Sequence, residues 1–347
     1  MKLLPLDTLV ETKAIWKALS VAHRNLAELK GICETLPNPQ LLMQTLALQE
    51  AKDSSEIENI ITTHSDIYLA QGDEVLSVAA KEVQTYAEGL TAGWEAVRDT
   101  GLIRLDTILN VQRCIEHNRA GLRAVPGTVL KSESTGDIIY TPPQGKLEVE
   151  RLMNNLVEYI HSEDEDLDPL IKMAIVHHQF ESIHPFYDGN GRTGRILNIL
   201  MLIRDGLLNL PILYLSRYIN QTKEDYYRLL QAVREEGAWE AWCLYILEGI
   251  TQTAIHEKEL IKQLRTLMSD YKQRIRGEYK FYSQDLLNNL FRYPYTKIDF
   301  LVKDLSVSRP TASKYLEQLA EGGFLRRQKV GKTVFYVNQP LFELLSL

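Results

Sequence analysis

The sequence predicts a mainly α-helical fold that carries one β-hairpin and ends in a small winged helix-turn-helix domain. Apolar residues recur at helical spacing almost throughout the first 270 residues. The pattern changes between Gly127 and Gln144, where two short apolar runs flank a polar turn. From residue 281 onward, three short helical patterns are followed by two strand-like runs.

Glycine, proline and acidic clusters divide the helical region. Glycine and proline fit the interior of a helix poorly, so such clusters mark its ends. The expected breaks lie at Pro37–Pro39, Gly72-Asp73, Gly101, Gly121–Thr128, Ser162–Asp168 and Gly206–Pro211. The acidic run at residues 163–166 is expected to be a solvated loop or the start of a helix.

The composition is that of an ordinary globular protein. With 347 residues, of which 45% are hydrophobic and 24% charged, the chain is long enough for two or three domains. No apolar run approaches the roughly 18 residues that cross a bilayer, and the first ten residues lack a signal-peptide pattern. Three widely separated cysteines cannot form a disulfide framework. We therefore expect a cytoplasmic protein without membrane contact.

Residues 127–144 predict a β-hairpin. The runs 128–130 and 138–141 favour strands, the polar residues 132–136 favour a turn, and Pro142-Pro143 ends the second strand. From the pattern alone, the hairpin could be a surface feature without a function.

Residues 184–195 combine an imidazole, a carboxylate, three glycines, an amide and two guanidinium groups. Gly189-Asn190-Gly191 can turn its N–H groups toward an anion just before a helix, because glycine tolerates positive φ. Arg192 and Arg195 share a helical face and can contact further phosphate oxygens. Each of these residues has a structural explanation by itself, but a simple turn needs no such combination.

Two more side chains complete this stretch. Asp188 can hold a divalent cation, and His184 can accept a proton because an imidazole titrates near neutral pH. The stretch resembles the signature of the Fic family, His-x-Phe-x-Asp/Glu-Gly-Asn-Gly-Arg-x-x-Arg, and matches it at every defined position. This resemblance implies a Fic-type helical core in which the hairpin is the flap.

The resemblance also implies a reaction, in which AMP is transferred from ATP to a Ser, Thr or Tyr hydroxyl of a protein and pyrophosphate is released. His184 would be the general base, and Asp188 would hold Mg²⁺ between the α- and β-phosphates. Arg192 would bind the outgoing pyrophosphate, and Arg195 would fix the γ-phosphate. The signature residues expected to contact the nucleotide are Asp188, Gly189, Asn190, Gly191, Arg192, Thr193, Gly194 and Arg195. Phe186 is expected to anchor the loop in the core.

A second motif lies upstream, at residues 54–59, after an expected helix over residues 41–52. Alone, it would be a helix end or an exposed capping segment. It resembles the inhibitory motif of the family, Ser/Thr-x-x-x-Glu-Gly/Asn, with Ser54, Glu58 and Asn59 at the defined places. The resemblance implies that Glu58 pairs with Arg195 and blocks productive γ-phosphate binding, and a competing carboxylate would have that effect.

By resemblance, the hairpin is the flap that aligns a target segment above the catalytic histidine by main-chain pairing. Its expected edge residues, which we group with the nucleotide site, are Ile138, Ile139 and Tyr140.

Tyr226 and Tyr227 lie where related enzymes place an aromatic pair near the adenine and ribose. Adjacent helical residues cannot face the same way, so we expect one of the two to line the nucleotide pocket. Core packing is the competing explanation for both.

The C-terminal part resembles a winged helix. Helical patterns at 283–291, 297–305 and 308–321 precede strand patterns at 324–329 and 333–337. Ser308 is expected to cap the third helix, which would bury Ala312, Leu316 and Leu319. The residues left for contact are Thr311, Ser313, Lys314 and Gln318 on that helix and Arg326, Arg327, Lys329 and Lys332 in the wing.

The charge of residues 281–347 permits DNA binding without demanding it. These residues hold nine Lys and Arg against six Asp and Glu, a balance of +3 in a chain of net charge −7. That excess is small for a dedicated DNA-binding domain. Protein contact, target presentation or dimerisation is an equally good use of the domain.

The sequence therefore predicts an N-terminal helical region (1–100) with the inhibitory motif, a Fic catalytic core (101–253), a helical linker (254–280) and a winged-helix domain (281–347). The leading prediction is an autoinhibited protein adenylyltransferase, and a homodimer is expected by resemblance. A branch of the family that phosphorylates its target has Lys at the position of Gly191, so the glycine argues against phosphorylation. The branch that transfers phosphocholine is a narrow subset of the family, so that activity is less expected. Two further functions are compatible with the sequence: a DNA-binding transcriptional regulator with the core as nucleotide sensor, and an enzyme that removes AMP.

Overall fold

A computed structural model of the chain describes residues 1–6, 12–35, 39–63, 77–132, 135–162, 167–330 and 333–346. The described part is mainly helical, as the periodicity predicts. The helices of the body are α1 (Lys13–Glu34), α2 (Pro39–Ile57), α4 (Val78–Thr100), α5 (Leu105–Glu116), α6 (Lys146–His161), α7 (Pro169–Ile183), α8 (Asn190–Arg204), α9 (Leu215–Gln221), α10 (Lys223–Glu236) and α11 (Trp239–Glu278). The expected breaks at Pro37 and Gly72-Asp73, the acidic run at 163–166, and Gly331 and Lys332 lie outside the described residues.

Helices α7 and α8 form the centre of the body. Every residue of α7 from Leu170 to Ile183 is buried, and α8 is buried from Arg192 to Leu202. Helices that are enclosed on all sides belong in the middle of a protein. Helices α4 and α5 pack against α8, while α6 and α11 pack against α7. This arrangement places the loop between α7 and α8 at one end of the core.

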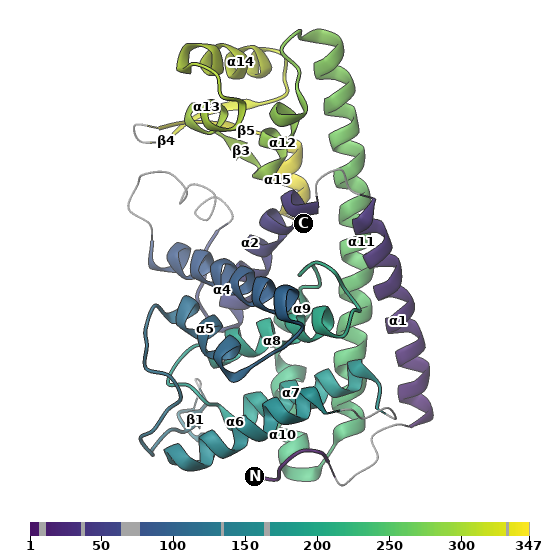
Figure 1. Cartoon of the computed structure of the whole chain (residues 1–347), viewed down its shortest axis with the longest axis vertical. Coiled ribbons are helices and arrows are strands. Elements are labelled where there is room, and N and C mark those ends of the chain that lie inside the picture. The colour runs from purple at the N-terminus through teal and green to yellow at the C-terminus, as the bar shows by residue number, and fades with distance from the viewer. Residues whose placement is uncertain are drawn as a thin grey trace.

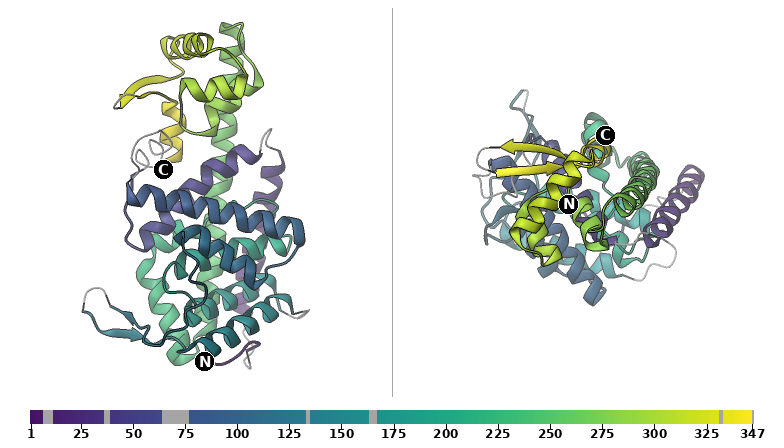
Figure 2. Two further views of the ribbon diagram at one scale, coloured as in Figure 1. Left: turned by 60° about the vertical axis from the view of Figure 1, so that its left-hand side comes forward. Right: turned by 90° about the horizontal axis from the view of Figure 1, so that it is seen from above.

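Helix α11 connects the body to the C-terminal elements (Figures 1 and 2). It contains 40 residues without a break and is therefore ~60 Å long at 1.5 Å per residue. Helix α1 lies along it, and Ala254 and Ile261 of α11 are completely buried. The helix expected as a linker from Ala254 is thus the continuation of a body helix. Among the described helices, α11 included, none combines the length and apolarity needed to cross a membrane.

The C-terminal elements follow the predicted order, with two additions. They are α12 (Gln284–Arg292), β3 (Tyr295–Thr296), α13 (Ile298–Leu305), α14 (Arg309–Glu321), β4 (Arg326–Val330), β5 (Thr333–Val337) and α15 (Gln339–Leu345). The short strand β3 and the helix α15 were not predicted. The sheet is antiparallel in the order β3-β5-β4. Ser308 caps α14 by accepting from the Thr311 N–H, and Ala312, Leu316 and Leu319 are buried, as predicted.

Helix α2 lies between the body and the C-terminal elements (Figure 1). It packs on α4 and α9 and also meets α12. The Gln49 side-chain amide donates to the backbone oxygen of Leu345 at the end of α15. The helix was expected to end at Lys52, but it continues to Ile57. Ser54 and Ser55, which resemble capping residues in sequence, are buried within its last turn.

The packing of α4 against its neighbours depends on a glycine. A Cβ at Gly93 would lie 2.9 Å from Val111 Cγ2 on α5 and 3.0 Å from Leu200 Cδ1 on α8. These distances are shorter than ordinary carbon contacts, so a side chain here would push α4 away from two helices. By contrast, a Cβ at Gly31 on α1 would meet nothing within 4 Å.

These two glycines should respond in opposite ways to the same substitution. Gly31→Ala is expected to raise the free energy of unfolding by ~0.5–1 kcal/mol, because alanine favours the helix. Gly93→Ala is expected to lower it by about 1 kcal/mol or more, since overpacking outweighs helix propensity. Urea unfolding followed by circular dichroism measures both, and a stabilised Gly93→Ala would contradict the tight packing.

Candidate active site

The side chain of one asparagine bridges the loop between α7 and α8. Asn190 Oδ1 accepts from the Phe186 N–H at 2.8 Å, and Asn190 Nδ2 donates to the Phe186 oxygen at 2.9 Å. The Phe186 ring is completely buried beside Phe180, as expected. The side chain of Asn190 is therefore used within the protein, which leaves its backbone N–H for a ligand.

The first turn of α8 presents free backbone donors. Gly189, at φ 77°, is the N-cap of α8, and the Thr193 N–H bonds back to its oxygen. The N–H groups of the first three residues, Asn190 to Arg192, have no partner within the helix. Helix N-termini of this kind bind anions. Beside them, Asp188 is exposed, and its Oδ1 accepts from the Gly189 N–H at 2.7 Å.

His184 follows α7 in the left-handed region, with φ 49°. Burial lowers the pKa of its imidazole to about 4, and the cationic Arg123 and Arg234 act in the same direction, while Glu58 and Asp188 oppose them. The ring is therefore neutral at neutral pH and can accept a proton.

Arg192 is buried between two glutamates. Its Nη1 lies 2.8 Å from Glu82 Oε2 on α4, and its Nη2 lies 2.7 Å from Glu116 Oε1 on α5. Burial raises the pKa of Glu116, against the effect of Arg192. Arg192 and Arg195 were expected to turn toward phosphate together, but in this structure they contact different carboxylates.

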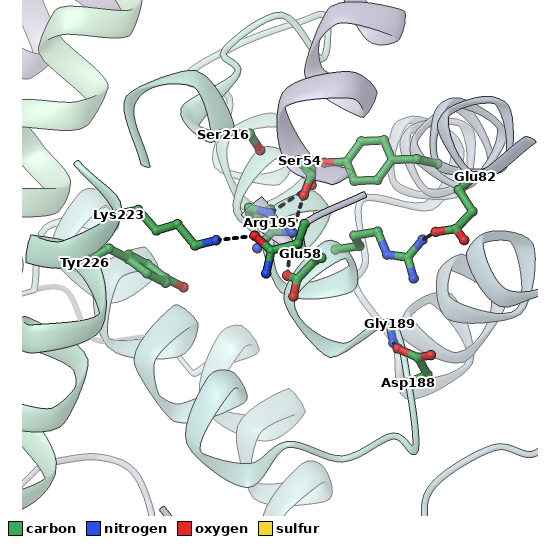
Figure 3. A network of polar contacts seen from close by, with 12 residues as sticks. Ser54, Glu58, Glu82, Asp188, Gly189, Arg195, Ser216, Lys223 and Tyr226 are labelled. Atoms are coloured by element: carbon green, nitrogen blue, oxygen red, sulfur yellow. Dashed lines mark hydrogen bonds and ion pairs between the residues drawn. The ribbon is translucent and has the colours of Figure 1, made fainter. Parts of the chain in front are cut away.

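Arg195 is held by the upstream motif (Figure 3). Its Nη2 lies 2.9 Å from Glu58 Oε1 and donates to the Ser54 oxygen at 2.9 Å, while its Nε donates to Ser54 Oγ at 2.8 Å. The guanidinium is 2% exposed. Burial would lower its pKa, but Glu58 and the surrounding acidic groups hold the pKa above the ordinary arginine value. Next to Glu58, Asn59 accepts from the Lys223 ammonium at 3.1 Å.

The three glycines of the signature each make room for a carboxylate. A Cβ at Gly189 would lie 2.5 Å from Glu116 Oε1, one at Gly191 would lie 2.2 Å from Glu58 Oε1, and one at Gly194 would lie 2.4 Å from Glu181 Oε1. These are not distances that two such atoms can keep. The glycines thus let acidic side chains approach the arginine-bearing helix α8.

The two tyrosines of α10 have different surroundings. Tyr226 is buried, and its hydroxyl lies 2.9 Å from His177 Nε2. The His177 ring stacks on Trp242 at 5.9 Å between centroids. Tyr227 is 46% exposed. Core packing accounts for Tyr226, so Tyr227 is the better candidate for the nucleotide pocket.

The hairpin pairs as predicted. β1 (Leu130–Lys131) and β2 (Ile138–Tyr140) are antiparallel, with Leu130 opposite Tyr140. The Tyr140 hydroxyl donates to the Ser182 oxygen of α7 at 2.9 Å. Ile138 and Ile139 are more than half exposed. The hairpin is thus anchored beside the signature loop at Tyr140, while the two isoleucines are accessible to a ligand.

Comparison with known protein families accounts for most of the chain. The family model described as Fic/DOC family N-terminal matches residues 16–95, and the one described as Fic/DOC family matches residues 102–202. A third, described as protein adenylyltransferase SoFic-like, C-terminal domain, matches residues 267–341. The chain belongs to the Fic family. The three matches follow one another in the order of the body, the signature and the C-terminal elements.

Named relatives of this Fic protein match it over limited segments. A probable protein adenylyltransferase of Aquifex aeolicus is 39% identical over 85 residues, which are 24% of this chain and 26% of that protein. The protein adenylyltransferase Fic of Nematostella vectensis is 31% identical over 161 residues, which are 45% of this chain and 36% of the relative. The matches therefore span between about a quarter and about a third of these relatives.

Solved structures extend the similarity to the whole fold. A Fic family protein from Desulfovibrio desulfuricans G20 has a TM-score of 0.61 at 21% identity, with 96% of this chain and 98% of that chain covered. Fic-1 from C. elegans has a TM-score of 0.55 at 20% identity over 71% of this chain and 73% of its own. At these identities the likeness establishes the Fic fold.

Several residues that shape the site were not found from the sequence. Arg123 is buried, donates to the His184 oxygen at 2.7 Å and to the Ile183 oxygen at 3.0 Å, and also contacts the Pro143 oxygen. Glu82 and Glu116 were missed as partners of Arg192. Nothing near these residues in the sequence marks them, because each meets its partner only after folding.

Glu50 is a further unpredicted member of this Fic site. It lies one turn before Ser54 on α2 and is buried. Its Oε1 accepts from the Tyr86 hydroxyl at 2.8 Å and from Ser216 Oγ at 2.5 Å. Burial raises its pKa to about 7, against the effect of these two hydrogen bonds. Glu50 therefore ties α2 to α4 and α9.

The raised pKa of Glu50 predicts a pH dependence of stability. The folded state holds the proton more tightly than the unfolded state, so this contribution falls as the pH rises from about 4.5 to about 7. Between pH 5 and pH 8 the wild type should lose unfolding free energy as Glu50 ionises. Glu50→Gln should lose roughly 2–3 kcal/mol less over the same range. The measurement is urea unfolding across that range.

The matched control for Glu50→Gln is Glu158→Gln, which alters an exposed glutamate of α6. It should leave the pH dependence as in the wild type. Identical curves for the wild type and Glu50→Gln would contradict the assignment of the proton to Glu50.

Proposed function

We propose that this chain is an autoinhibited protein adenylyltransferase. It transfers AMP from ATP to a Ser, Thr or Tyr hydroxyl of a target protein, which can be the enzyme itself, and releases pyrophosphate. The observation that carries the proposal is the placement of a neutral His184, the free N–H groups of α8 and two buried arginines around one loop. The names of the matched relatives support the same activity.

In the proposed reaction, a ring nitrogen of His184 takes the proton from the target hydroxyl. The hydroxyl oxygen forms a bond to the α-phosphorus. The bond between the α-phosphorus and the oxygen that bridges it to the β-phosphorus breaks, and this oxygen leaves with the pyrophosphate. The N–H groups at the start of α8 and the Arg192 guanidinium stabilise the charge on the phosphates and on the leaving pyrophosphate. Glu82 and Glu116 fix the position of the Arg192 guanidinium.

Asp188 is suited to hold a divalent cation, for which we propose Mg²⁺. It is exposed, and among the described residues the one hydrogen-bond donor to its carboxylate is the Gly189 N–H, which bonds to Oδ1. Within the described residues, no group of three or more His, Cys, Asp or Glu could hold a metal. A magnesium ion bound through one carboxylate would therefore complete its shell with phosphate oxygens and water, and it would neutralise phosphate charge.

Autoinhibition follows from the contact between Arg195 and Glu58. We propose that Arg195 binds the γ-phosphate in the active state. In the described structure the Glu58 carboxylate occupies this guanidinium, and Ser54 supplies two more acceptors. A triphosphate and Glu58 cannot both use Arg195, so release of Glu58 is required for transfer.

We infer a contact role for the C-terminal elements. Arg326 and Lys329 on β4 and Lys314 on α14 are exposed, whereas Arg327 lies 3.3 Å from Glu317. DNA or an acidic protein surface would suit these side chains. The homodimer and the cytoplasmic location remain predictions.

The first test of the proposal follows label from α-labelled ATP onto protein in the presence of Mg²⁺. Glu58→Gly should raise labelling by ~10–100-fold, because one charge-assisted contact that competes with the nucleotide is lost. Adding His184→Ala to that variant should lower labelling by ~10²–10⁴-fold, the usual contribution of a general base. With γ-labelled ATP, no protein should become labelled, because the γ-phosphate leaves with the pyrophosphate.

Glu158→Gly is the control for this experiment, because it makes the same change in an exposed helical glutamate away from Arg195. It should label as the wild type does. Equal labelling of Glu58→Gly and wild type would refute autoinhibition, and label from the γ-position would show phosphorylation in place of AMP transfer.

The low pKa of His184 predicts the pH profile of transfer. Its imidazole is already neutral above about pH 5, so the rate of the Glu58→Gly variant should be nearly constant from pH 6 to pH 8. The rate should fall only as the pH approaches about 4 and the ring becomes protonated. Initial rates with α-labelled ATP test this expectation, and a midpoint near the ordinary imidazole pKa would contradict it.

A further inference from the structure

A polar cavity lies beside α2. Its volume is about 240 Å³, and its lining comes from α2, α9, α11 and the end of α15. The residues used in the argument are Glu50, Asp53, Tyr214, Arg217, His256 and Glu257. Apart from Glu50, which ties α2 to α4 and α9, none of its lining residues has a role in the function proposed above.

Two buried polar groups in the lining have no hydrogen-bond partner among the described residues. They are Glu257 Oε2 and the Tyr214 hydroxyl. Glu257 is 5% exposed and Tyr214 is 3% exposed. Buried polar atoms in proteins are almost always hydrogen-bonded, and leaving one without a partner is unfavourable. Both residues line the cavity, and a donor bound there would supply the partner that each atom lacks.

The charge of the lining indicates a cation. The cavity contains four carboxylates, Glu50, Asp53, Glu56 and Glu257, against the cationic Lys52 and Arg217, a balance of −2 when all are ionised. Lys52 is engaged by Asp53 and Glu56, and Arg217 donates to His256 Nε2 at 2.6 Å. Burial raises the pKa of Glu257 to about 8; Arg217 opposes this shift, while Glu50 and Asp53 add to it. A bound cation would relieve this concentration of negative charge.

The geometry favours an organic cation over a metal ion. No described group of three or more His, Cys, Asp or Glu could hold a metal. An ammonium group donates hydrogen bonds and accepts none, which suits a carboxylate and a tyrosine oxygen. One water molecule needs a cavity of ~10–15 Å³. This cavity is far larger, so it has room for an aliphatic chain beside the ammonium group.

We propose that this cavity binds a small aliphatic amine through Glu257 and Tyr214, and that the bound amine strengthens autoinhibition. The second part rests on the proposed function. Helix α2 supplies Glu50 and Asp53 to the cavity, and it supplies Ser54 and, directly after its last turn, Glu58 to Arg195. A ligand that joins α2 to α9 and α11 stabilises the docked position of α2 by mass action. By linkage, it lowers the population able to bind the triphosphate productively.

Binding is tested by calorimetry on the full chain with 1,4-diaminobutane, n-butylamine and butane-1,4-diol. The diamine should bind most tightly because the lining has two more acidic than basic side chains and a bound cation favours their ionised forms. The monoamine should bind more weakly, and the diol not detectably. Glu257→Gln should weaken diamine binding by at least ~tenfold, and Tyr214→Phe should weaken it less. The control Glu259→Gln, an exposed glutamate of the same helix, should bind as the wild type does. Absence of amine binding, or equal binding by Glu257→Gln and wild type, overturns the proposal.

Regulation is tested by AMP transfer with and without saturating diamine. Transfer by the wild type should fall severalfold, and transfer by Glu58→Gly should not change. Calorimetric binding together with an inactive Glu58→Gly would leave the amine site standing and refute the proposed function. An active Glu58→Gly together with no calorimetric binding of the amine would refute the amine site and leave the proposed function standing. Binding without any change in wild-type transfer would overturn the regulatory part of the proposal.

Discussion

The site depends on the need to neutralise Arg195. A guanidinium that is 2% exposed cannot remain without an anionic partner, because an unpaired buried charge is strongly destabilising. Glu58 and the two Ser54 oxygens satisfy it in this structure. Any anion that displaces Glu58 must supply equivalent contacts, as the γ-phosphate of a nucleotide would. In the function we propose, inhibition and nucleotide binding are thus two solutions to the same electrostatic requirement.

Helix α2 transmits this requirement through the molecule. Its last turn carries Ser54, Glu58 follows directly, and Glu50 ties the preceding turn to α4 and α9. Its earlier turns meet α12 and the end of α15. Because a helix moves largely as a unit, an event at the C-terminal elements or in the cavity beside α11 can change the position of Glu58. The proposed autoinhibition therefore involves contacts of α2 with the body and with the C-terminal elements.

The sequence predicted the features that are encoded locally. Most helices, the hairpin, the cap at Ser308 and the signature loop are specified by neighbouring residues. The resemblance to the family came from two short contiguous stretches, residues 184–195 and 54–59. Glu82, Glu116 and Arg123 could not be predicted, since each acts on a residue at least 60 positions away. The end of α2 was misjudged because Ser54 and Ser55 resemble caps, whereas one binds Arg195 and both are buried. Strand β3 exists only through pairing with β5, and two residues give too little pattern to predict it.

The central claim is that Glu58 and the γ-phosphate compete for Arg195. The most direct measurement is calorimetric affinity for ATP and for ADP, each with Mg²⁺, in the wild type and in Glu58→Gly. The account predicts that the substitution increases the affinity for ATP by about tenfold more than the affinity for ADP, since only ATP has the phosphate that replaces Glu58. Equal changes in the affinities for both nucleotides would contradict it.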